Sequence, residues 1–155
     1  MLQPPGSYIC WAAVAACVGN RFTGSKDNAI DAARWFFGDD YNHGAFAGSI
    51  THILTYKYKL SFYSTYSTTP SISTLYSNVN IGKPVPVRFS WVSGTSSDNH
   101  FVLTYGVENS SGNSYISIMD PGCGITSAKQ DNTGSITYIY PGTSTVMRIT
   151  TGYCA

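Results

Sequence analysis

Residues 9–18 read Ile9-Cys10-Trp11-Ala12-Ala13-Val14-Ala15-Ala16-Cys17-Val18, an unbroken run of apolar residues. The residues at 4–7, just before it, are Pro-Pro-Gly-Ser and resist regular structure, whereas Gly19 and Asn20 after it are typical of a helix C-terminus. The pattern therefore predicts a helix over residues 11–18, with Cys10 in its first turn.

Cys10 is the residue in this run with the most reactive side chain. The first turn of a helix has backbone N–H groups without helical partners, and these groups and the helix dipole favour a thiolate. The N–H of Cys10 can also donate to an oxyanion that develops on a substrate carbonyl, and the side-chain amide of Gln3 is the natural second donor. We therefore identify Cys10 as a candidate nucleophile and Gln3 as a candidate oxyanion-hole residue.

A base for this cysteine is expected from a hairpin in the second half of the chain. Residues 101–105 and 115–119 are rich in β-branched and aromatic side chains, and residues 106–113 between them are rich in turn formers. If the hairpin is symmetric about Ser110, His100 lies directly opposite Asp120. The carboxylate would then orient one imidazole nitrogen and leave the other for the Cys10 thiol, as in a catalytic triad.

Together, Gln3, Cys10-Trp11-Ala12-Ala13, Asn99-His100-Phe101 and Asp120-Pro121-Gly122 resemble the motifs of the papain-like cysteine peptidases of clan CA. Their order, over nearly the whole chain, is similar to that in compact bacterial branches, the C39-like and C70-like (AvrRpt2-like) peptidases. The resemblance implies Cys10 as nucleophile, His100 as general base and acid, Asp120 as the orienting residue and Gln3 as the oxyanion-hole donor. Two departures are that Gln3 lies seven residues before Cys10, slightly farther than usual, and that Asp120 stands where papain has Asn.

The remaining patterns predict helices first and an antiparallel sheet afterwards. Residues 25–37 and 49–58 have apolar side chains at helical spacing, and residues 71–80 are typical of a short helix or turn. Residues 60–66 and 85–91 are predicted strands, and residues 135–140 and 145–150 a closing hairpin. We expect an α+β, papain-like fold with the active site in the cleft between helices and sheet, where Trp11, Trp91 and residues 42–48 are candidate walls.

Length and composition are consistent with one domain over residues 1–155. Only 11% of the residues are charged and the net charge is +1, so no electrostatic argument favours nucleic acid or an anionic membrane as partner. Residues 9–18 are too short to span a bilayer and follow no basic residue, so we interpret them neither as an anchor nor as a signal peptide. We expect a secreted or extracellular monomer that acts on a peptide or protein.

The chain has four cysteines. Cys10 and Cys17 would lie about 10.5 Å apart along one helix axis, which is too far for a disulfide. Cys123 follows the Asp120 strand and Cys154 is next to the last residue, so we hypothesise a disulfide between these two. Cys17 fits a small apolar packing residue.

The other residues with metal-binding or acid–base side chains have simpler interpretations. His43, in a loop, and His52, on a helix, are expected to be surface or packing residues, and Asp39-Asp40 a solvated turn. The sequence has no cluster with zinc or calcium spacing, and we expect neither a metal nor an organic cofactor.

The function expected from these residues is acyl transfer through a thioester on Cys10. The same residues suit peptide hydrolysis, isopeptide cleavage, transglutamination or amide hydrolysis, and the sequence does not separate these reactions. Two hypotheses from other classes are a catalytically silent papain-like domain that binds peptides or a partner protein, and a small secreted adhesion or structural domain. The presence of Cys10, His100 and Asp120 together favours the enzyme.

Overall fold

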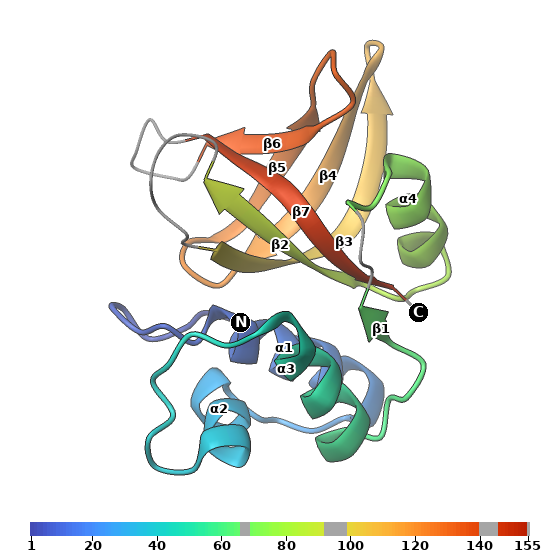
Figure 1. The fold of residues 1–155 in the computed structure, drawn as a ribbon. Helices are drawn as coiled ribbons and strands as arrows, with labels where there is room; N and C mark the ends of the chain where they lie inside the picture. The colour runs from blue at the N-terminus through green and yellow to red at the C-terminus, as the bar shows by residue number, and fades with distance from the viewer. Residues whose placement is uncertain (66–68, 92–98, 140–145, 155) are drawn as a thin grey trace.

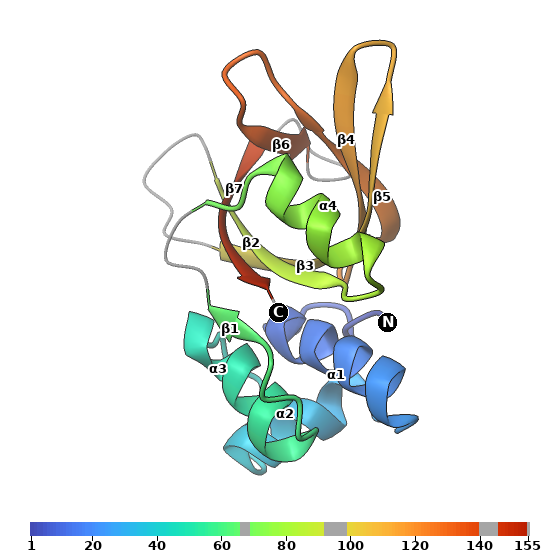
Figure 2. The ribbon, with the colours of Figure 1, turned by 90° about the vertical axis from the view of Figure 1, so that its right-hand side faces the viewer.

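The computed structural model describes residues 1–65, 69–91, 99–139 and 146–154, and in it a layer of helices lies beneath a curled antiparallel sheet (Figure 1). The helical layer contains α1 (Cys10–Thr23), α2 (Ala29–Phe37), α3 (Ala47–His52) and a π-helical turn, η1 (Ile53–Lys57). Helix α4 (Ile72–Asn80) packs on the sheet instead (Figure 2). The architecture is therefore α+β.

Helix α1 continues beyond Gly19 and Asn20, so the predicted end of this helix is wrong. It ends at Thr23, where Gly24 has a left-handed φ of 73° and donates its N–H to the Asn20 carbonyl at 2.9 Å. Gly19 is needed for a different reason, because a Cβ at this position would overlap the ring of Tyr58. The glycine lets η1 pack closely against α1 instead of ending the helix.

The other two N-terminal helices also differ from their predicted ranges. Helix α2 begins at Ala29, not at residue 25, because Asn28 and Asp31 form a capping box. The Asn28 side chain accepts from the Asp31 N–H at 2.9 Å, and the Asp31 carboxylate accepts from the Asn28 N–H at 2.8 Å. The helix predicted over residues 49–58 is divided into α3 and η1.

The sheet is antiparallel at every pairing among the described residues. Its order is β1-β7-β2-β3-β4-β5-β6, and β6 also pairs with β7, so the sheet closes on itself. The strands are β1 (Ser64–Thr65), β2 (Val85–Trp91), β3 (Asn99–Ser110), β4 (Asn113–Asp120), β5 (Gly124–Gln130), β6 (Ile136–Ile139) and β7 (Val146–Cys154). β5 is a strand that the sequence patterns do not predict, and of residues 60–65 only the two in β1 form a strand.

The β3–β4 hairpin turns at Ser111-Gly112, not symmetrically about Ser110, so the predicted register is wrong. Thr104 pairs with Ile118 and Gly106 with Ser117, which leaves Tyr105 as the extra residue of a β-bulge. Continued past Leu103 and Met119, this register places Asp120 across from Val102. Asp120 is thus diagonal to His100 on the same face of the sheet, within reach of a long side chain.

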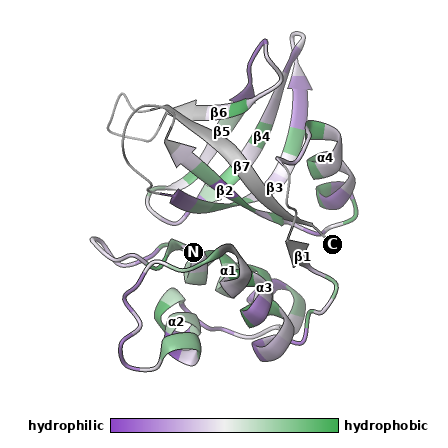
Figure 3. Ribbon diagram, viewed as in Figure 1, coloured by the Kyte–Doolittle hydropathy of each residue, from purple (hydrophilic) through white to green (hydrophobic). Residues whose placement is uncertain are grey.

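Two groups of buried apolar side chains hold the layers together, and hydrophobic residues are present in both layers (Figure 3). The first group joins the helices to the outer face of the sheet and includes Trp11, Phe101, Leu103 and Met119. The second fills the curled sheet and is covered by α4 through Leu75. Since β3 contributes to both groups, its residues alternate between the helical layer and the interior of the sheet.

Candidate active site

Cys10 is the first residue of α1 and lies where the helical layer meets the sheet. The residue before it, Ile9, makes no side-chain cap of the helix, so no capping side chain competes for the N–H groups of the first turn. The Cys10 side chain is partly buried, and residues 11–19 that follow it are buried except for the partly buried Cys17. The fold therefore presents a thiol at a fixed helix N-terminus, with the positive end of the dipole towards it.

His100 and Asp120 are joined by a short hydrogen bond. The distance from His100 Nε2 to Asp120 Oδ1 is 2.6 Å, the carboxylate is fully buried and the His100 residue is 8% exposed. The N–H of Gly122 donates to the same Oδ1 at 2.7 Å. These contacts fix the carboxylate, and they leave Nδ1 as the ring nitrogen for another partner.

The Cys10 side chain also hydrogen-bonds with the His100 side chain. Burial acts to lower the pKa of His100, but its hydrogen bonds with Asp120 and Cys10 and the charges of both groups outweigh this effect and raise the pKa to about 9. The structure thus brings together three of the four predicted site residues, with the imidazole between the thiol and the carboxylate.

This environment predicts that the protein loses stability at alkaline pH. Because the pKa of His100 is raised from 6.5 to about 9, its contribution is fully present below pH 6.5 and is lost as the pH rises through 9. We expect the free energy of unfolding, measured by urea titration, to fall by on the order of 2 kcal/mol over this window. A His100→Gln variant should have a flatter profile, and equal slopes for the two proteins would contradict this assignment.

Gln3 lies beside the end of the Asp120 strand, because its backbone N–H donates to the Pro121 carbonyl at 2.9 Å. Its side-chain Nε2 donates to the Ser7 carbonyl at 3.0 Å, whereas Oε1 is buried without a hydrogen-bond partner. In this conformation the amide stabilises the loop before Cys10. To stabilise an oxyanion, it would have to use its second N–H or turn away from Ser7.

Cys123 is a neighbour of the site that the sequence did not assign to it. Its thiol hydrogen-bonds with Asp120, and burial, the charge of Asp120 and that hydrogen bond raise the pKa of Cys123 to about 11. A Cys-Gly turn directly after the Asp120 strand was the signal available in the sequence.

The hypothesised disulfide between Cys123 and Cys154 is wrong, because Cys123 is free. Cys123 lies in the turn between β4 and β5, whereas the backbone of Cys154 pairs with Ser64 at the β1 edge of the sheet. Strands about 4.8 Å apart intervene, and a disulfide spans only about 6 Å between Cα atoms. The Cys154 side chain itself lies outside the described residues.

The remaining predicted residues lie outside this centre. The exposed His43 side chain pairs with Asp40 at 2.9 Å, and His52 packs against Trp35, Phe36 and Tyr56. Cys17 is partly buried against the helical core, as expected of a packing residue.

The three predictions for residues that line a cleft differ in their outcome. Trp11 is fully buried and cannot line a cleft, so that prediction is wrong. The Trp91 side chain lies outside the described residues. In the 42–48 segment, Asn42 accepts a hydrogen bond from the Tyr8 N–H at 2.9 Å and so lies against the loop that leads to Cys10.

Neither a protein-family model nor a curated protein matches this chain. Among the described residues, no helix is long and apolar enough to cross a membrane, and no group of three or more His, Cys, Asp or Glu side chains could hold a metal ion.

Proposed function

We infer that this protein is a cysteine peptidase of the papain-like type, in which Cys10, His100 and Asp120 form the catalytic triad. The observation that carries this inference is the imidazole of His100, held by a fully buried carboxylate and in contact with a thiol at a helix N-terminus. The order of the layers supports it, because the thiol comes from the helices and the imidazole and carboxylate come from the sheet.

His100 carries its proton at neutral pH, since its pKa is about 9, and the thiolate of Cys10 is the nucleophile of the proposed reaction. The thiolate attacks the carbonyl carbon of the scissile peptide, and the oxyanion is stabilised by the N–H of Cys10 and by the Gln3 amide once it has reoriented. His100 then protonates the leaving amine, and a thioester remains on Cys10. Water, deprotonated by His100, hydrolyses the thioester and restores the thiolate.

Asp120 keeps the imidazole in the orientation and tautomer that these steps need. With Nε2 bound to the carboxylate, Nδ1 is the ring nitrogen left for proton transfer to and from the sulfur. The net charge of +1 gives no reason to expect a strongly charged substrate, so we propose peptides or proteins as substrates. A secreted or extracellular location is part of the same proposal.

Brief alkylation by substoichiometric iodoacetamide at about pH 6 tests the nucleophile. An ordinary thiol, with a pKa of about 8.5, is almost fully protonated there, so rapid reaction identifies a thiolate. Peptide mapping should find Cys10 modified at least about tenfold faster than Cys17 and Cys123, the latter a matched slow control because its pKa is raised to about 11. His100→Ala should reduce the rate at Cys10 to that of the other two thiols.

A screen of peptide substrates follows, with Cys10→Ala as the inactive control. Turnover that depends on Cys10 supports the peptidase, and acyl transfer to an added amine in place of water would reassign it as a transglutaminase. Equal, slow labelling of all three thiols in a folded protein would overturn the proposal of an enzyme and favour the catalytically silent binding domain.

A further inference from the structure

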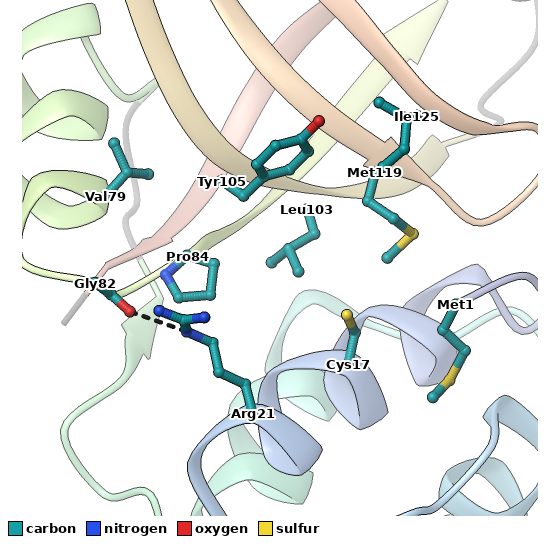
Figure 4. Close-up of a pocket in the computed structure, with 10 residues that line it drawn as sticks. All are labelled: Met1, Cys17, Arg21, Val79, Gly82, Pro84, Leu103, Tyr105, Met119 and Ile125. Atoms are coloured by element: carbon teal, nitrogen blue, oxygen red, sulfur yellow. Dashed lines mark hydrogen bonds between the residues drawn. The ribbon is translucent and has the colours of Figure 1, made fainter.

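A cavity of about 490 Å³ lies between the two layers, on the part of α1 remote from Cys10. Figure 4 shows Cys17 and Arg21 on the α1 side, with Leu103 and Tyr105 on the β3 side. This volume is in the usual range for sites that bind small molecules. The residues that line it are Met1, Cys17, Arg21, Val79, Gly82, Pro84, Leu103, Tyr105, Met119 and Ile125.

The walls of this cavity are mainly aliphatic. Leu103 and Met119 are almost completely buried and form its inner part, whereas Ile125 is 72% exposed and Tyr105 44% exposed. An exposed isoleucine beside a buried apolar hollow leaves hydrocarbon surface in contact with water. An aliphatic ligand would cover this surface and gain about 25 cal/mol for each Å² that it removes from water.

Arg21 is the only charged side chain among the residues that line the cavity. Its Nε donates to the Gly82 carbonyl at 3.2 Å, which holds the guanidinium at the rim between α1 and the end of α4 (Figure 4). No acidic residue is among the lining residues, so the charge of Arg21 is not balanced within the cavity. A guanidinium with free N–H groups is well suited to bind a carboxylate.

We propose that this cavity binds an aliphatic monocarboxylate, with its chain between Leu103, Met119 and Ile125 and its carboxylate on Arg21. The apolar walls select a hydrocarbon chain, and the guanidinium of Arg21 selects a negatively charged head group. The site is separate from Cys10 and His100, neither of which lines it, so the proposal does not depend on the peptidase activity.

Three ligands of equal chain length test the proposal: decanoate, decanol and decylammonium, each below its micellar range. The first readout is the alkylation rate of Cys17, which a ligand in the cavity should lower, with the rate of Cys10 as internal control. Calorimetric titration gives the affinities. We expect decanoate to protect Cys17 saturably and to bind at least about tenfold more tightly than decanol, and decylammonium to bind most weakly.

Arg21→Gln should reduce the affinity for decanoate to that for decanol, whereas Lys26→Gln, an exposed cation outside the cavity, should leave it unchanged. Ile125→Glu places a negative charge at the mouth of the cavity and should weaken the binding of decanoate more than that of decanol. Equal binding of the three ligands, equal protection of Cys10 and Cys17, or no effect of Arg21→Gln would each overturn the proposal. So would the absence of binding by decanoate to the folded protein.

Discussion

Replacing Asp120 with alanine should lower the rate of Cys10 alkylation at about pH 6, and any peptide turnover, by about 10²–10⁴-fold. The carboxylate is fully buried and accepts from His100 and from the Gly122 N–H, so alanine leaves both donors without their acceptor. Without the negative charge, the pKa of His100 falls and the imidazole is free to rotate away from the thiol. Rates are measured by peptide mapping, and circular dichroism checks that the variant is folded.

Asp120→Asn is the matched control for this change. The asparagine carbonyl can still accept from Nε2 but carries no charge, so we expect a smaller loss than with alanine and a His100 pKa nearer its ordinary value. An alanine variant that is folded and labels as fast as the wild type would show that Asp120 does not orient His100.

Trp11→Ala should destabilise the protein by about 3–5 kcal/mol, a large part of the stability of a domain of this size. The Trp11 ring is fully buried and makes edge-to-face contacts with Phe36 at 5.6 Å and Phe37 at 5.7 Å between ring centroids. Its Nε1 donates to the His43 carbonyl at 2.8 Å. Alanine would leave a cavity between α1 and α2. Urea unfolding at constant pH measures the resulting decrease in the free energy of unfolding.

Trp11→Phe separates the packing of the ring from its hydrogen bond. Phenylalanine keeps an aromatic ring in place but cannot donate to His43, so we expect it to retain most of the stability lost in Trp11→Ala. Because Trp11 follows Cys10 directly, Trp11→Ala should also slow the alkylation of Cys10. A loss of less than about 1 kcal/mol in Trp11→Ala would contradict the central role of this ring.

The parts of the fold that the sequence predicts well are those set by local patterns. Alternation of apolar residues predicts β2, and Ser71 begins α4 as a side-chain N-cap, close to the predicted range. Gly24 ends α1 as a left-handed C-cap, whereas Gly19 lies inside the helix because the Tyr58 ring packs closely against it, a contact between distant segments. No local pattern reveals such a contact.

The β3–β4 pairing that places Asp120 near His100 could not be predicted from local patterns either. Ser111 and Gly112 both have positive φ and form a tight two-residue turn. Pairing uninterrupted from this turn would place Asp120 across from Leu103, on the opposite face from His100. The extra residue, Tyr105, shifts the pairing by one position and returns Asp120 to the face of His100. The sequence predicts the pair of residues, but it does not reveal the two offsets that bring them together.

The β3–β4 hairpin beyond this bulge is a place where the chain can be lengthened. Residues 108–112 are exposed. The paired residues of β3 and β4, from Ser110–Asn113 to Thr104–Ile118, separate this tip from the candidate active site. A peptide inserted between Ser111 and Gly112 would project from the end of the sheet without changing those residue pairs (Figure 1). The tip can therefore carry an added recognition sequence or label while the geometry around Cys10 is kept.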